Sequence, residues 1–114
     1  MPPALLPWSA DGLLDEPALR QQLPALTPWR LDRPEQHPRL TRTWTTPDFA
    51  TAAALASRLV ILAEAVRHHP DISFGWGYVT VSWHTRDLGG IHENDLRLAR
   101  ATDQLFANAP ENAP

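Results

Sequence analysis

Two adjacent histidines, His68 and His69, are the side chains of this sequence best suited to proton transfer. An imidazole changes charge near neutral pH, so it can act as a general acid or as a general base. Both residues precede Pro70, where a long apolar pattern with helical spacing must end. Because two neighbouring side chains at that place cannot both face the core, at least one is expected to open to solvent or to a cleft. The alternative is structural, since cations near the C-terminus of a helix are favoured by its dipole.

A second set of candidate residues follows in the next strand and at the start of the last helix. His84 and Arg86 are two residues apart in an alternating segment, so they are expected to share one strand face, roughly 6 to 7 Å apart. Arginine stays protonated near neutral pH, so Arg86 can bind a polar edge of a ligand but cannot act as a base. Asp95 falls in the first turn of the last helix, where an acid also stabilises the helix dipole by about 0.3 to 1 kcal/mol. His92, just before that helix, has two interpretations, as a residue that approaches the site or as a solvated loop residue, and the second is expected.

Helical and strand patterns alternate along the chain and would position these residues. The patterns predict helices at about 16–26, 46–67 and 93–106, and strands at 29–31, 39–45, 72–76 and 78–85. The long helix is expected to begin at Thr46, whose hydroxyl would accept a backbone N–H, with Pro47 and Asp48 in its first turn. The fold class is therefore α+β, in the order helix-strand-strand-helix-strand-strand-helix. We expect a four-stranded, antiparallel-rich sheet with helices on one face.

Length and cysteine content limit the architecture. The 114 residues fit one domain, which we place at 13–107, between a loose N-terminal arm at 1–12 and a loose tail at 108–114. A chain this short gains from added burial, so a homodimer or homotetramer is expected. The absence of cysteine excludes disulfides, zinc–thiolate sites, iron–sulfur clusters and thiol nucleophiles.

Charge and hydropathy indicate a soluble, cytoplasmic protein. The net charge is −3, and the ten basic residues, all arginines, are scattered rather than gathered in a stripe, so direct binding to nucleic acid is not expected. No apolar run approaching roughly 18 residues is recognised, which predicts no membrane span. The segment from Met1 to Trp8 lacks the basic and apolar regions of a secretory signal.

The segment from Glu64 to Asp95 resembles the pterin-4a-carbinolamine dehydratases, which are also known as dimerisation cofactors of a homeodomain transcription factor. That family shares a Glu, three residues and then His-His-Pro, which stand here at Glu64 and 68–70. The next positions of the pattern are an aromatic residue, a His or Trp, and an Asp, and they are occupied by Trp76, Arg86 and Asp95. Three of the four parts of the pattern therefore agree, and arginine replaces the His or Trp.

This resemblance covers about Leu14 to Phe106 and implies an activity as well as a fold. It implies dehydration of 4a-hydroxytetrahydropterin to quinonoid dihydropterin, without a metal or an organic cofactor. His68 would be the main proton-transfer residue, His69 would contact or orient the pterin, and Asp95 would hold a partner by a hydrogen bond. The expected substrate contacts are Arg86, His84 and Trp76.

Arg86 also supports a second interpretation, in which the chain is a non-catalytic relative that binds protein. Such a relative would resemble the RuBisCO assembly factors of carboxysomes or act as a dimerisation partner. A binding protein loses little when an imidazole is replaced, whereas an enzyme without one proton-transfer group would lose perhaps 10²- to 10⁴-fold in rate. The two interpretations therefore differ mainly in what they require of Arg86.

Overall fold

The computed structural model describes residues 2–34 and 37–107. Its helices and strands are α1 (Glu16–Gln22), β1 (Arg30–Asp32), β2 (Arg39–Thr45), α2 (Phe49–Val66), β3 (Asp71–Gly75), β4 (Tyr78–Trp83) and α3 (Glu93–Ala107). Short 3-10 turns lie at η1 (Ala10–Gly12), η2 (Leu23–Leu26) and η4 (Arg86–Leu88). This order confirms the predicted α+β arrangement.

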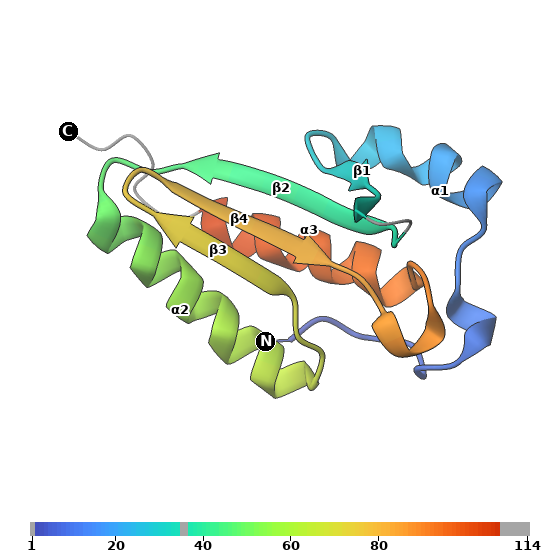
Figure 1. The fold of residues 1–114 in the computed structure, drawn as a ribbon. Helices are drawn as coiled ribbons and strands as arrows, with labels where there is room; N and C mark the ends of the chain where they lie inside the picture. The colour runs from blue at the N-terminus through green and yellow to red at the C-terminus, as the bar shows by residue number, and fades with distance from the viewer. Residues whose placement is uncertain (1, 35–36, 108–114) are drawn as a thin grey trace.

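The four strands form one sheet in the order β1-β2-β4-β3, and every neighbouring pair is antiparallel. Figure 1 shows α2 and α3 side by side on one face of this sheet. In the central pair, Leu40 stands opposite Trp83, and Trp44 stands opposite Val79. All four side chains are buried. The alternation of β2 and β4 thus directs their apolar side chains toward the helices, as predicted.

Aromatic rings join the sheet to α3 and to the segment after η2. Trp44 meets Phe106 at 4.6 Å between ring centroids and Trp29 at 5.6 Å, both edge to face. The indole N–H of the fully buried Trp83 donates to the Thr102 hydroxyl on α3 at 3.0 Å. Because these contacts fix α3 against β4, they also fix the first turn of α3 near the end of that strand.

The start of α2 differs from the prediction. The N-cap is Asp48, in extended conformation, and its carboxylate accepts the backbone N–H of Thr51 at 2.8 Å. The side-chain hydrogen bond with Thr51 lowers the pKa of Asp48 below its ordinary value. The hydroxyl of Thr46 instead donates to the carbonyl of Asp48 at 3.0 Å. The expected cap at Thr46 was wrong because the carboxylate lies directly before the first helical residue and competes better for the free N–H groups.

Helix α2 is also more apolar than predicted. By length and composition alone it could cross a membrane, with a mean hydropathy of 1.7 over 18 residues. Its buried face packs on the sheet through Ala52, Leu55, Ala56, Leu59 and Ala63. Its outer face leaves Val60 and Ile61 49% and 71% exposed. Packing on the sheet therefore accounts for one face of this apolar helix, while the other face presents apolar side chains to solvent in the single chain.

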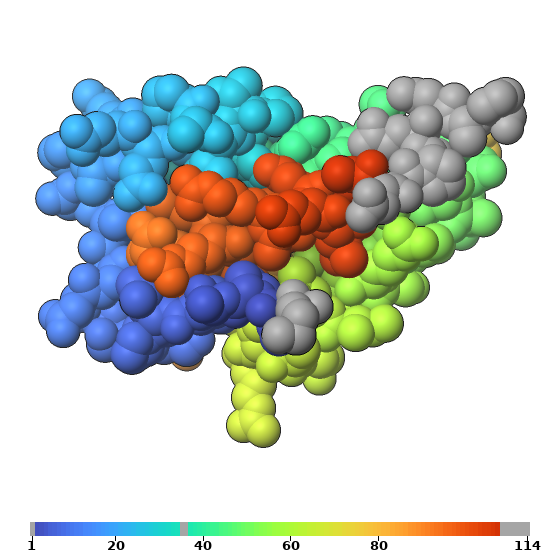
Figure 2. Space-filling model, turned by 180° about the vertical axis from the view of Figure 1, so that it is seen from behind, coloured from blue at the N-terminus to red at the C-terminus, as the bar shows by residue number. Residues whose placement is uncertain are grey.

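The segment before α1 is held against α3. The backbone N–H of Leu6 donates to the side-chain oxygen of Asn94, and the Asn94 amide donates back to the carbonyl of Leu6, both at 2.8 Å. Further along, the N–H of Leu14 donates to the carbonyl of Ile91 at 2.9 Å. Figure 2 shows this segment, in dark blue, running along α3. The arm predicted to be loose therefore makes specific contacts, whereas the predicted tail at 108–114 lies outside the described residues.

Candidate active site

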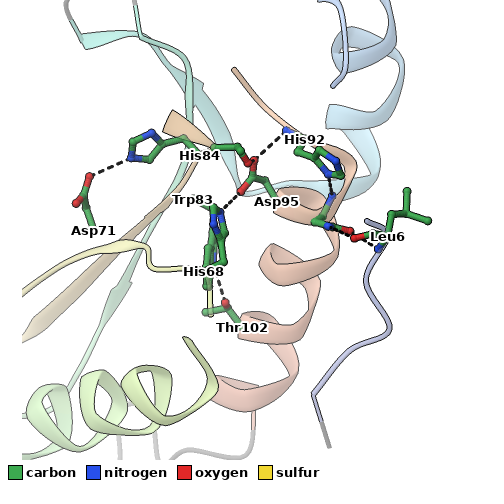
Figure 3. Close-up of polar contacts among 10 residues, drawn as sticks. Leu6, His68, Asp71, Trp83, His84, His92, Asp95 and Thr102 are labelled. Atoms are coloured by element: carbon green, nitrogen blue, oxygen red, sulfur yellow. Dashed lines mark hydrogen bonds and ion pairs between the residues drawn. The ribbon is translucent and has the colours of Figure 1, made fainter. Parts of the chain in front are cut away.

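His68 lies immediately after the left-handed residue that ends α2. Arg67 has a φ of 56°, a conformation that costs a non-glycine residue roughly 1 to 2 kcal/mol. The next backbone N–H, that of His68, donates to the carbonyl of Ala63 at 3.2 Å and closes the last turn. The side chain of His68 is 14% exposed, and its Nε2 lies 2.9 Å from Oδ1 of Asp95 on α3 (Figure 3). The end of α2 is thereby tied to the beginning of α3.

Asp95 is fully buried and has donors at both of its oxygens. Besides His68 at Oδ1, its Oδ2 accepts the Thr85 hydroxyl at 2.7 Å and the backbone N–H of His92 at 2.9 Å. An ionised carboxylate only accepts hydrogen bonds, so this arrangement assigns a proton to Nε2 of His68. The other ring nitrogen, Nδ1, is then the one that can exchange a proton with a ligand.

His92 is the N-cap of α3 rather than a solvated loop residue. Its Nδ1 accepts the backbone N–H of Asn94 at 3.0 Å, and its own N–H is bound by Asp95. This reciprocal arrangement resembles a capping box, with histidine at the N-cap bound to the second helical residue and aspartate reaching back from the third. The side chain is 0% exposed. The expectation of a solvated residue was wrong because the N-terminal segment covers this turn, which local sequence does not indicate.

Two indole rings contact the imidazole of His68. Trp83 of β4 is nearly parallel to it, with 5.7 Å between ring centroids and 18° between planes. Trp8 of the N-terminal segment is closer, at 4.3 Å and 35°. Sequence reasoning missed Trp8, since the proline-rich segment around it has no periodicity and is far from His68 in the chain.

A cavity of about 520 Å³ opens beside His68 and Trp8. Its lining includes four of the predicted site residues and Trp8, and consists of Trp8, Arg67, His68, His69, Pro70, Asp71, His84, Thr85, Arg86, Asp87 and Leu88. Small-molecule sites in proteins commonly have volumes of about 300 to 1,000 Å³. The volume and the basic lining therefore suit a small polar ligand.

The remaining imidazoles of the cavity differ in their surroundings. The side chain of His84 is only 11% exposed, and its Nε2 lies 3.3 Å from Oδ2 of Asp71. His69 is 64% exposed, and its Nε2 lies 2.5 Å from Oε2 of Glu64, which is itself 69% exposed. His84 is thus the second imidazole at this cavity that is both shielded from solvent and paired with a carboxylate.

Trp76 does not reach this cavity. It follows the last residue of β3, whereas Asp71, the first residue of that strand, lines the cavity. Five residues of extended strand span roughly 16 Å. Trp76 is 73% exposed on the turn to β4. The expectation of a substrate contact from Trp76 at this cavity is therefore not met within one chain.

Comparison with known proteins agrees with this geometry. Residues 12–105 match the family described as pterin 4 alpha carbinolamine dehydratase. A protein of Chlorobium limicola named "putative pterin-4-alpha-carbinolamine dehydratase" is 46% identical over 99 residues, which cover 87% of this chain and 82% of the relative. A protein of Chlorobaculum tepidum with the same name is 42% identical over 87 residues, covering 76% and 78%.

Two solved structures share the fold. A transcriptional coactivator/pterin dehydratase from Brucella melitensis superposes with a TM-score of 0.72 at 27% identity, covering 82% of this chain and 97% of that one. A pterin dehydratase-like protein identified as a RuBisCO assembly factor of the alpha-carboxysome has a TM-score of 0.57 at 28% identity, covering 71% and 90%. The family match and these relatives show that the chain belongs to the pterin 4 alpha carbinolamine dehydratase family.

Proposed function

We propose that this protein dehydrates 4a-hydroxytetrahydropterin to quinonoid dihydropterin. The observation that carries the proposal is the bond from His68 to the fully buried Asp95 at a cavity that also holds His84. Family membership supplies the substrate class, because the relatives of this chain are named for this reaction.

The reaction requires two proton transfers. The bond between C4a and its hydroxyl oxygen breaks, N5 loses its proton, and a double bond forms between N5 and C4a as water leaves. One group must protonate the departing hydroxyl and another must remove the N5 proton, so that the protein ends with as many protons as it began.

His68 and His84 are the pair that we assign to these transfers. Asp95 holds the proton of His68 on Nε2 and leaves Nδ1 for the pterin, while Asp71 pairs with Nε2 of His84. His84 would thereby provide the imidazole that arginine replaces at position 86. Arg86 and His69 then bind polar edges of the pterin, for which a guanidinium with its fork of donors is well suited.

Arg86 also favours a second candidate function. A non-catalytic member of the family could keep this fold and bind a protein partner, and one structural neighbour is described as a RuBisCO assembly factor. In that case His84 would have no catalytic role, and the hydrogen bond between His68 and Asp95 would serve only to join α2 to α3.

The two functions are separated by the rate at which quinonoid dihydropterin forms from enzymatically generated 4a-hydroxytetrahydropterin. We expect the intact protein to accelerate this step over buffer, and His84→Ala to reduce kcat/KM roughly 100-fold because one proton-transfer group is lost. Arg86→His should change it less, and Arg100→His, an exposed arginine on α3, serves as the matched control.

Absence of acceleration by the intact chain would contradict the proposal. If Arg86→His then created activity, the chain would be a relative that lost its chemistry through this one replacement. If Arg86→His did not create activity, the result would favour the second candidate function, a non-catalytic relative that binds a protein partner.

We also propose that the protein is a cytoplasmic homo-oligomer. The outer face of α2 exposes Val60 and Ile61, and Phe49 at the start of that helix is 52% exposed beside Phe74 of β3. Apolar side chains gathered in this way would be covered by a second copy of the chain. Light scattering on the purified protein measures the assembly, and a strictly monomeric mass would contradict it.

A further inference from the structure

The N-terminal segment brings an aromatic side chain into the site. Trp8 lies 4.3 Å from the ring of His68 and 4.9 Å from the ring of His92, measured between centroids. It is 38% exposed and lines the cavity. The indole therefore contacts the imidazole that we assign to proton transfer and is also accessible from the cavity.

Specific hydrogen bonds hold this segment in place. Leu6 exchanges two hydrogen bonds with Asn94, whose side chain is fully buried, and Nη1 of Arg97 donates to the carbonyl of Ala4 at 3.1 Å. Figure 3 shows Leu6 beside the first turn of α3, from which Asp95 reaches His68. The same turn of helix thus anchors both the N-terminal segment and the imidazole.

Close packing at Gly12 also restricts the path of the segment. A Cβ atom added at Gly12 would lie 2.1 Å from Nε2 of His92, whose ring is fully buried and is held at Nδ1 by the backbone N–H of Asn94. The residue at this place must therefore lack a side chain for the segment to pass His92. Two independent features, the Leu6 hydrogen bonds and the Gly12 contact, thus hold the backbone on either side of Trp8.

We infer that Trp8 is a positioning residue of the dehydratase site, an inference that rests on the proposed function. The bond to Asp95 fixes one nitrogen of His68, but the terminal torsion of a histidine side chain has a broad preference. Contact with the indole limits the remaining rotation of the ring. Trp8 thereby keeps Nδ1 of His68 directed at the ligand, and its loss affects the proton-transfer step more than substrate binding.

Kinetic comparison of Trp8→Ala, Trp8→Phe and Tyr78→Ala tests this role. Misplacement of a catalytic group by about 1 Å can cost up to 10²-fold in rate, so Trp8→Ala should lower kcat roughly 10-fold or more while KM changes less than about threefold. Trp8→Phe should recover most of the loss because it keeps an aromatic ring. Tyr78 is 40% exposed, against 38% for Trp8, and does not line the cavity, which makes it the matched control. A kcat of Trp8→Ala equal to that of the intact protein would overturn the inference.

Proton NMR of the histidine ring signals separates failure of this inference from failure of the proposed function. The ring of His68 lies 4.3 Å from that of Trp8, within reach of its ring current, so the Cε1 proton signal of His68 should move in Trp8→Ala while that of the exposed His37 stays in place. If the protein proves to lack dehydratase activity and the His68 signal still moves, the contact stands and the proposed function fails. If the signal does not move, the positioning role is overturned whatever the activity.

Discussion

His68 and His69 are adjacent and each has a carboxylate at Nε2, yet they belong to different environments. The shorter contact is that of His69 with Glu64, at 2.5 Å, against 2.9 Å for His68 with Asp95. The exposures of the two side chains in each pair are 64% and 69% for the first and 14% and 0% for the second. Water competes for the exposed pair and screens its charges. The longer contact, between His68 and Asp95, therefore has the stronger interaction energy.

The location of each carboxylate explains what the two pairs do. Glu64 lies on α2 itself, so its contact with His69 joins only residues that are close in sequence, at the C-terminal end of that helix. Asp95 lies on α3 and is itself fixed by Thr85 and His92. The pair of His68 therefore joins separate elements and holds Nε2 of the imidazole in place, whereas His69 keeps the freedom of an exposed side chain.

The largest expected difference between the two histidines is in catalysis. We expect His68→Ala to reduce kcat/KM for dehydration by about 10²- to 10⁴-fold, as for loss of a general acid or base. His69→Ala should reduce it less than about 10-fold, because only a contact to the pterin is removed. Steady-state rates of both variants, with circular dichroism to verify folding, measure this. Equal losses in the two variants would contradict the assignment of proton transfer to His68 and of a pterin contact alone to His69.

Removal of the buried carboxylate should have the next largest effect. Asp95→Asn keeps the shape of the side chain but replaces one acceptor oxygen with a donor, which then faces one donor at the Oδ1 position or two at the Oδ2 position. A buried hydrogen bond to a charged group contributes roughly 1.5 to 3 kcal/mol, so the free energy of unfolding should fall by about 2 to 3 kcal/mol. Urea denaturation monitored by tryptophan fluorescence measures it, with Asp11→Asn as an exposed control. A loss below about 0.5 kcal/mol would mean that the hydrogen bonds around Asp95 add little to stability.

Local patterns predicted the fold well because each element carries its own signals. The bounds of β2 at Arg39–Thr45 agree with the prediction, and β4 ends at Trp83, two residues before the predicted end. At that point Thr85 pairs with Gly90 in an isolated bridge, and η4 begins with Arg86. Alternation of side chains continues through Thr85, which is buried, so the pattern alone could not show where pairing with β2 stops.

The site was predictable only where its residues share a motif. The family resemblance implied that Asp95 holds a partner by a hydrogen bond, and in the structure that partner is His68. The contribution of Trp8 and the burial of His92 depend on the N-terminal segment folding back onto α3, a tertiary contact without a local signal. Trp76 shows the reverse, since a motif position does not by itself bring a side chain to the cavity.

The smallest expected effect concerns the shorter of the two contacts, that between His69 and Glu64. Glu64→Gln removes the charge of the exposed partner of His69 in the same isosteric way as Asp95→Asn. Exposed ion pairs contribute about 0 to 1 kcal/mol, so the free energy of unfolding should change by less than about 0.5 kcal/mol, and 1 M salt should abolish the difference from the intact protein. The loss in Asp95→Asn should persist in that salt, because solvent ions do not reach a side chain that is 0% exposed. Urea denaturation at low and high salt measures both variants, and a salt-resistant loss of 2 kcal/mol or so in Glu64→Gln would show that burial does not decide between the two pairs.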